Sequence, residues 1–103
     1  MSKELDRVYK KYKKAVNMTY TELLIWSKKP LSKKASLSRE PIKRNLRLLK
    51  KNKSDWTARD ITEANKTISY LARAKKIKSS NYIQGNITRN DIALRNWAYD
   101  SFK

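Results

Sequence analysis

The chain has 103 residues, enough for one domain, and 26 Lys and Arg against 9 Asp and Glu give it a net charge of +17. It contains no His and no Cys. This excludes zinc fingers, imidazole bases, Cys or His nucleophiles, haem sites and iron–sulfur sites. Without a disulfide framework or an apolar leader, the sequence predicts an intracellular protein (nucleoid or cytoplasm) or one inside a virus particle, neither secreted nor membrane-spanning.

The composition still favours a folded chain. Mean hydropathy is −0.89, which leans toward disorder. However, 39% of the residues are hydrophobic, and three Trp, six Tyr and one Phe are among them. We expect a small folded domain under electrostatic self-repulsion, which salt or an anionic partner would stabilise.

The first two predicted helices lie before Pro30. The first spans Glu4 to Val16, and its apolar residues recur at helical spacing on one stripe: Leu5, Val8, Tyr9, Tyr12, Ala15 and Val16. Thr19 and Glu22 form a capping box that opens the second helix, which runs from Tyr20 to Lys28. Residues 23–26 are all apolar, which predicts burial between neighbours.

The third predicted helix follows a basic, Ser-rich connector. Ser38 is a candidate N-cap, and the helix runs to about Lys51. Its predicted apolar stripe consists of Ile42, Leu46 and Leu49. The opposite arc is basic and contains Lys43, Arg44, Arg47, Lys50 and Lys51.

The fourth predicted helix begins at Thr57, which is paired with Asp60 in a second capping signature, and it runs to about Lys76. The residues expected to face the core are Ile61, Ala64, Ile68, Leu71 and Ala72. Arg59, Lys66 and Arg73 recur every seven residues and fall on the opposite face.

The segment from Lys78 to Ile87 is predicted as a loop in preference to a short β-hairpin, with Gly85 at a positive φ. Thr88 and Asp91 cap a fifth helix that ends near Ser101. Its predicted buried stripe is Leu94, Trp97, Ala98 and Phe102. The fold class is therefore all-α, a compact bundle of four to five short helices in one domain over residues 1–103.

The charge excess indicates an anionic partner, since a small domain needs a net charge of only about 2–8 for solubility. Positive charge on several faces suits contact with a phosphate backbone, and arginine can clamp phosphate bidentately. The ordinary alternative is a solvated surface with ion pairs to Glu40, Asp60 and Glu63. The candidate nucleic-acid contacts are Lys33, Lys34, Arg39, Lys43, Arg44, Arg47, Lys50, Lys51, Lys53, Arg59, Lys66, Arg73, Lys75 and Lys76.

Aromatic and acidic residues allow further interpretations. By spacing, Tyr9, Tyr12, Trp26 and Trp97 belong to the core. Four other aromatics could stack on unpaired bases, namely Trp56, Tyr70, Tyr82 and Tyr99, and Trp56 could instead cover the core. Helix capping explains Asp55, Asp60 and Glu63 better than a nuclease metal site does. We expect no catalytic residue, metal or cofactor.

Three stretches of the sequence resemble a family of small basic proteins from archaea and DNA viruses: NMTYTELLIW, ASLSREPIKRNLRLLKKNKSDWTARDITEANKTISYLARAK and TRNDIALRNWAYD. Together they cover most of the chain. The resemblance implies that the chain is a complete unit and is compatible with a viral origin. It carries over no catalytic or binding residue, because no activity is established for the family.

We expect a non-enzymatic protein that binds DNA through its phosphates, largely independently of sequence, for packaging or chromatin-like organisation. Two alternatives stay open. One is a structural protein of a virus particle, a minor capsid or scaffold component whose basic surface meets the genome or acidic subunits. The other is an RNA-binding protein. The expected partners are thus nucleic acid, or acidic proteins and capsid subunits, and not a membrane.

Overall fold

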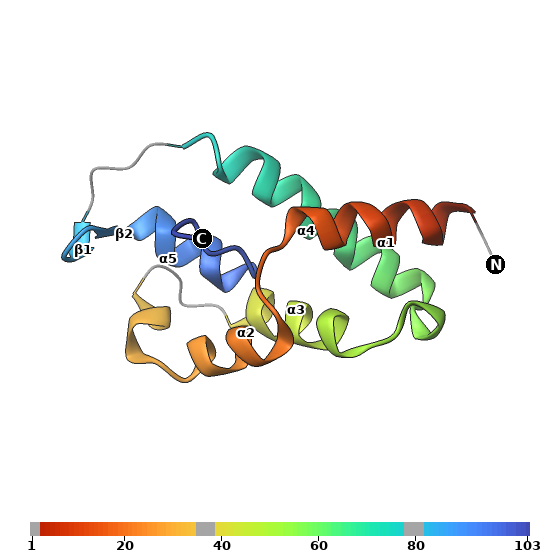
Figure 1. The fold of residues 1–103 in the computed structure, drawn as a ribbon, viewed down its shortest axis with the longest axis horizontal. Helices are drawn as coiled ribbons and strands as arrows, with labels where there is room; N and C mark the ends of the chain where they lie inside the picture. The colour runs from red at the N-terminus through yellow and green to blue at the C-terminus, as the bar shows by residue number, and fades with distance from the viewer. Residues whose placement is uncertain (1–2, 35–38, 78–81) are drawn as a thin grey trace.

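The computed structural model describes residues 3–34, 39–77 and 82–103, and helices make up most of it (Figure 1). The α-helices are α1 (Lys3–Ala15), α2 (Tyr20–Ser27), α3 (Glu40–Lys50), α4 (Ala58–Ala74) and α5 (Arg89–Asn96). The shorter elements are two 3-10 helices, η1 (Pro30–Lys33) and η2 (Lys53–Asp55), and an antiparallel hairpin of β1 (Tyr82–Gln84) and β2 (Ile87–Thr88). The predicted all-α bundle is confirmed.

Three helices begin at the capping boxes that the sequence predicts. In α2, the N–H of Glu22 donates to the Thr19 hydroxyl at 3.1 Å, and the N–H of Thr19 donates to the Glu22 carboxylate at 2.9 Å. The same reciprocal pair of bonds opens α4 at Thr57 and α5 at Thr88. Each box satisfies N–H groups that have no partner inside the helix, so these starts are set by local sequence.

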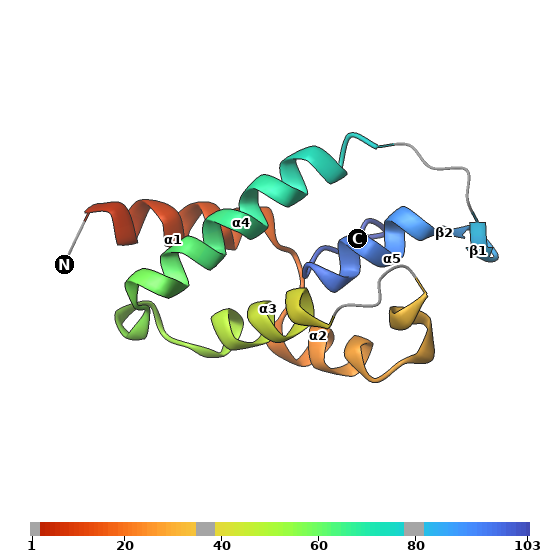
Figure 2. The ribbon, with the colours of Figure 1, turned by 180° about the vertical axis from the view of Figure 1, so that it is seen from behind.

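The first part of the core lies between α1 and α4, which pack across each other (Figures 1 and 2). Leu5, Val8 and Tyr12 of α1 are buried, as its predicted stripe requires. Trp56 is only 6% exposed and covers this part of the core. Its ring meets those of Tyr9 and Tyr12 edge-on, with centroids 5.0 and 5.5 Å apart. Trp56 is thus a cover on the core and cannot stack on bases in this structure.

The second part of the core joins α2, η1 and α5. The indole N–H of Trp26 donates to the side-chain oxygen of Asn96 at 2.8 Å. The amide group of Asn96 donates in turn to the carbonyl oxygen of Ser32 at 3.0 Å. All three residues are buried. Because a buried polar group needs a partner, these bonds fix how α5 sits on α2 and η1.

The predicted buried face of α3 is wrong in part. Ile42 is buried as predicted, but Asn45 and Leu48 complete the buried face. Leu46 and Leu49, predicted to be central, are half-buried at its edges. A hydrophobic pattern does not count an asparagine as a core residue, so the stripe read from apolar residues alone is rotated away from Asn45.

Several further predictions need correction. Ile25 is 55% exposed, because α2 buries only Leu23 and Trp26. In α4, Ala72 is exposed and Ala74 is buried. Phe102 is 50% exposed, because α5 ends before it. The errors in α2 and α4 share one cause: which arc of a helix is buried depends on the neighbour packed against it and not on its apolar content alone.

The C-terminal part differs most from the prediction. Residues 82–88 contain a hairpin where a loop is predicted, although Gly85 has the expected positive φ of 56°. Helix α5 stops at Asn96 because the chain turns at Ala98, where φ is 67°. The N–H groups of Asn17 and Met18 both donate to the carbonyl oxygen of Ala98, at 3.1 and 3.3 Å. The end of α5 is therefore hydrogen-bonded to the segment between α1 and α2, which is distant in sequence.

The start of α3 also differs from the expectation. The residue at its N-cap position is Arg39, whose side chain makes no capping bond, and a proline occupies the first turn. The predicted cap, Ser38, lies outside the described residues, as do residues 35–37 of the connector before it.

Candidate nucleic-acid interface

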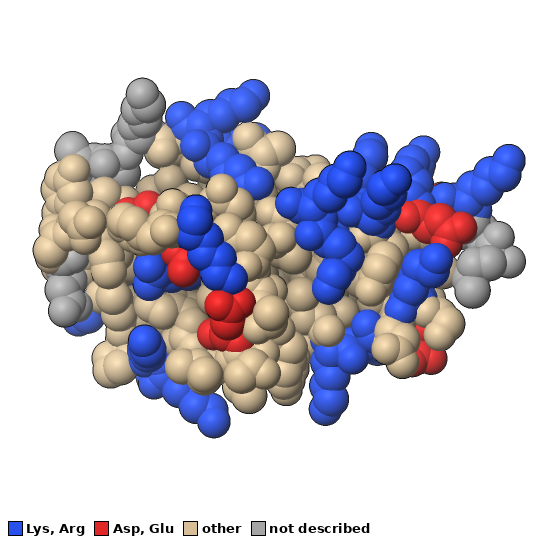
Figure 3. All heavy atoms as spheres, viewed as in Figure 1, with Lys and Arg blue, Asp and Glu red and all other residues tan. Residues whose placement is uncertain are grey.

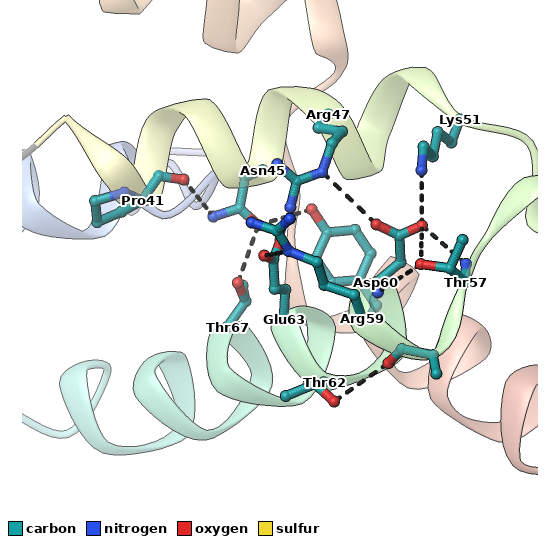
Figure 4. A network of polar contacts seen from close by, with 12 residues as sticks. Pro41, Asn45, Arg47, Lys51, Thr57, Arg59, Asp60, Thr62, Glu63 and Thr67 are labelled. Carbon is teal, nitrogen blue, oxygen red and sulfur yellow. Dashed lines mark hydrogen bonds and ion pairs between the residues drawn. The ribbon is translucent and has the colours of Figure 1, made fainter.

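Three predicted contact residues lie against buried acids. Asp60 and Glu63 of α4 are only 1% and 8% exposed. The Nζ atom of Lys51 lies 2.8 Å from the Asp60 carboxylate, and Arg47 pairs with both acids. Arg59 lies 3.1 Å from Glu63 (Figure 4). We call these five residues the α3–α4 ion-pair cluster. Buried carboxylates need such partners, so the charges of all three cations are engaged in ion pairs, although the side chain of Arg59 is 79% exposed.

The charge state of Asp60 follows from this arrangement. Burial acts to raise the pKa of its carboxyl group. The hydrogen bonds from Lys51 and from the backbone of Thr57, together with the positive charge of Lys51, outweigh burial and hold the pKa below its ordinary value of 3.8. Asp60 is therefore charged at neutral pH. The basic arc predicted on α3 is consequently interrupted, because Arg47 and Lys51 compensate this charge.

Arg39 also has internal partners. Its guanidinium donates to the carbonyl oxygen of Ser27 at 2.8 Å and to the hydroxyl of Ser32 at 3.2 Å. These bonds tie the residue before α3 to the end of α2 and to η1. The side chain is half-buried, so its first role is to position these segments.

Two other predicted contacts lie over aromatic rings. The guanidinium of Arg44 is 5.6 Å from the centre of the Trp97 ring, and the ammonium of Lys75 is 4.2 Å from the centre of the Tyr99 ring. Such contacts orient a cation without neutralising its charge. Both residues can therefore still attract phosphate.

The remaining predicted contacts are exposed, and within residues 3–34, 39–77 and 82–103 all of them except Lys53 are unpaired, with no ion pair or hydrogen bond from the side chain. The unpaired residues come from η1 and the residue after it, from α3, from α4 and from the segment that follows α4. They are Lys33, Lys34, Lys43, Lys50, Lys66, Arg73 and Lys76.

Lys66 and Arg73 border an open hollow of about 620 Å³ on the exposed side of α4, which we call the α4 groove. It is lined by Thr62, Asn65, Lys66, Ser69, Tyr70, Arg73 and Trp97. The rings of Tyr70 and Trp97 stack 4.2 Å apart with 14° between their planes. Burial raises the pKa of Tyr70 against the opposing charge of Arg73, so its hydroxyl stays protonated. The groove thus combines two free cations with uncharged hydrogen-bonding groups and an aromatic wall.

A second basic surface was not among the predicted contacts. Lys and Arg side chains crowd the part of the molecule that α1 crosses (Figure 3). An open hollow of about 550 Å³ there is bordered by Lys10, Lys13 and Lys14 and by Lys53, which pairs with Asp6 at 2.8 Å. We call the following exposed residues the α1 basic face: Lys3, Arg7, Lys10, Lys13 and Lys14.

The sequence contains the signal that would have identified this face. Four of its residues recur at positions 3, 7, 10 and 14, on the side of α1 opposite Leu5, Val8 and Tyr12. Glu4 and Asp6 are the acids of this helix, and Asp6 is paired with Lys53. Among the described residues, no member of the α1 basic face has an ion pair. None of these five residues is among the predicted contacts.

The other aromatic candidates for base stacking are in different settings. Tyr70 and Tyr99 are half-buried against Trp97 and Lys75. Tyr82, on the hairpin, is 62% exposed. Only Tyr82 therefore presents an open ring among the four residues proposed for stacking.

In the part of the chain that the structure describes, no group of three or more acids could hold a metal ion. The carboxylates of Asp60 and Glu63 already form ion pairs with Arg47, Lys51 and Arg59. None of the described helices has the length and apolar character needed to cross a membrane.

Comparison of the chain with family models, curated proteins and solved structures gives no match. The resemblance to small basic proteins of archaea and DNA viruses therefore rests on the quoted residues alone.

Proposed function

We propose that this protein binds nucleic acid through its phosphates, largely independently of sequence, and that the ligand is double-stranded DNA that it helps to package. It acts by binding and not by catalysis. On this proposal it resides with the DNA that it covers, in a nucleoid or inside a virus particle.

The observation that carries the proposal is the separation of charges. Asp60 and Glu63 are buried in the ion-pair cluster, and Glu22, Asp60 and Asp91 serve helix caps. These four acids thus have structural partners, whereas exposed cations without partners remain on α1, α3 and α4. A net charge of +17 destabilises a small fold by self-repulsion, so an anionic partner that needs this charge is the better explanation.

Duplex DNA meets this requirement. It carries one negative charge per ~1.7 Å of helix axis, and binding releases its condensed counterions. Sequence-specific proteins usually concentrate their base contacts on one recognition helix that follows a tight turn. Here α3 and α4 are joined through the 3-10 helix η2, and Arg47 and Lys51 are withdrawn into ion pairs. This arrangement favours contact with phosphates over contact with base edges.

The test is the salt dependence of binding to a short duplex of random sequence, followed by fluorescence anisotropy. If about six phosphates are contacted, the logarithm of the binding constant should fall with the logarithm of salt concentration with a slope near −5. Duplexes of different sequence should give the same line. Absence of binding at low salt would overturn the proposal and direct the search to an acidic protein partner, whose association would survive nuclease. Preference for structured RNA would overturn the assignment to DNA.

A further inference from the structure

The two basic surfaces belong to different elements. The α1 hollow is bordered by α1 and Lys53, and the α4 groove by α4 and Trp97, so they share no residue. The α1 basic face points away from the side of α1 that packs on the core. Lys66 and Arg73 lie on the exposed side of α4, away from its buried Ala64 and Leu71.

The two helices also lie on opposite broad sides of the molecule. In Figure 1, α1 crosses in front of α4, and in Figure 2, seen from behind, α4 crosses in front of α1. Both views look down the shortest axis of the molecule, along which it measures 23 Å. The direction that separates α1 from α4 is therefore the thickness of the protein.

This thickness matters for electrostatics. The Debye length is about 8 Å at physiological ionic strength, so charges separated by the full thickness are largely screened from each other. A polyanion on the α1 side would leave the cations of the α4 groove unneutralised. A second polyanion could bind at the α4 groove with little repulsion from the first. The positive charges of the protein, which lie between the two polyanions, would attract both.

We infer that a single molecule bridges two DNA duplexes, one held on the α1 basic face and the other on the α4 groove. This inference rests on the proposed function and extends it from coating DNA to joining separate segments. Bridging makes packaging efficient, since the second contact forms at the high effective concentration that the first one creates. It also has a concentration signature: excess protein occupies each duplex separately and removes the bridges.

The experiment measures capture of a second duplex. One random-sequence duplex is tethered to beads, and a fluorescent duplex is captured only if protein joins the two. Wild-type protein should give capture that rises and then falls as protein is added. Two variants remove one surface each: Lys10→Glu with Lys14→Glu on the α1 side, and Lys66→Glu with Arg73→Glu on the α4 side. Each should still bind the tethered duplex and lose capture.

A matched control carries the same change of charge elsewhere. Lys28→Glu with Lys29→Glu alters two exposed lysines after α2 that belong to neither surface, and it should retain capture. Circular dichroism verifies that every variant is folded, and the neutral Gln versions repeat the test if a Glu version unfolds. An equal mixture of the α1-side and α4-side variants should not recover capture.

The possible failures are distinguishable. If wild-type protein binds the tethered duplex but never captures a second one, bridging is overturned and the proposed function stands. If both variants still capture, or if their mixture recovers capture, the bridges do not come from two faces of one molecule, and the inference is overturned. If the tethered duplex binds no protein at low salt, the proposed function itself fails.

Discussion

The hydroxyl group of Tyr12 on α1 donates a 2.8 Å hydrogen bond to the side-chain oxygen of Asn45 on α3, and both side chains are fully buried. The same oxygen accepts a bond of 3.0 Å from Thr67 on α4. The amide nitrogen of Asn45 donates to the carbonyl oxygen of Pro41 at 2.8 Å. One asparagine thus connects the helices that carry the two basic surfaces.

Asn45→Ala should lower the free energy of unfolding by about 2–4 kcal/mol, because it leaves the buried hydroxyls of Tyr12 and Thr67 without their acceptor and opens a cavity. Tyr12→Phe should cost only about 1 kcal/mol, since the asparagine oxygen keeps its bond from Thr67. Urea unfolding of both variants measures the difference. A Tyr12→Phe variant as unstable as Asn45→Ala would show that the network is not centred on Asn45.

Asp60 should make stability depend on acid pH. Its pKa in the folded protein is below the ordinary 3.8, so its ion pairs stabilise the fold above that pH, and this contribution is lost as pH falls through the lowered pKa. Asp60→Asn should destabilise the protein by about 2 kcal/mol at neutral pH. The stability difference between wild type and variant should shrink below pH 3.8, as measured by urea unfolding at a series of pH values. A difference that stays constant with pH would contradict the assigned ion pairs.

Exposed and ion-paired cations should behave differently in DNA binding. Lys66→Gln with Arg73→Gln removes two unpaired charges and should reduce the salt slope by about 2, with little effect on stability. Arg47→Gln removes a cation of the α3–α4 ion-pair cluster, so it should leave the slope nearly unchanged and lower the free energy of unfolding by about 1–2 kcal/mol. Anisotropy titrations and urea unfolding of the same preparations separate the two effects. An equal loss of slope in both variants would place Arg47 on the DNA.

Salt alone should stabilise the free protein. Raising ionic strength from about 0.01 to 0.1 M shortens the Debye length from about 30 to 10 Å, which weakens repulsion among the unpaired cations. If this is worth ~1 kcal/mol, the melting temperature should rise by about 4–8 °C for a domain of this size. The Lys28→Glu, Lys29→Glu variant carries less charge and should show a smaller rise. A melting temperature that is constant or falls with salt would mean that self-repulsion does not limit stability.

The chain itself determined what depends on neighbours in sequence. The Thr–Glu and Thr–Asp boxes at Thr19, Thr57 and Thr88 start their helices as predicted, because each is closed within four residues. The apolar stripe of α1 and the positive φ of Gly85 are likewise local properties. The excess of positive charge follows from the amino-acid composition alone and does not depend on the fold.

Tertiary structure decided what depends on distant partners. Asn45 is a core residue only because Tyr12 and Thr67 reach it, and α5 ends where Asn17 meets Ala98. The sequence predicts Arg47 and Lys51 to be surface charges. In the structure, the packing of α3 on α4 brings both side chains into ion pairs with Asp60. Periodicity finds the faces of one helix, but which face is covered, and which charge is neutralised, follows from the helix packed against it.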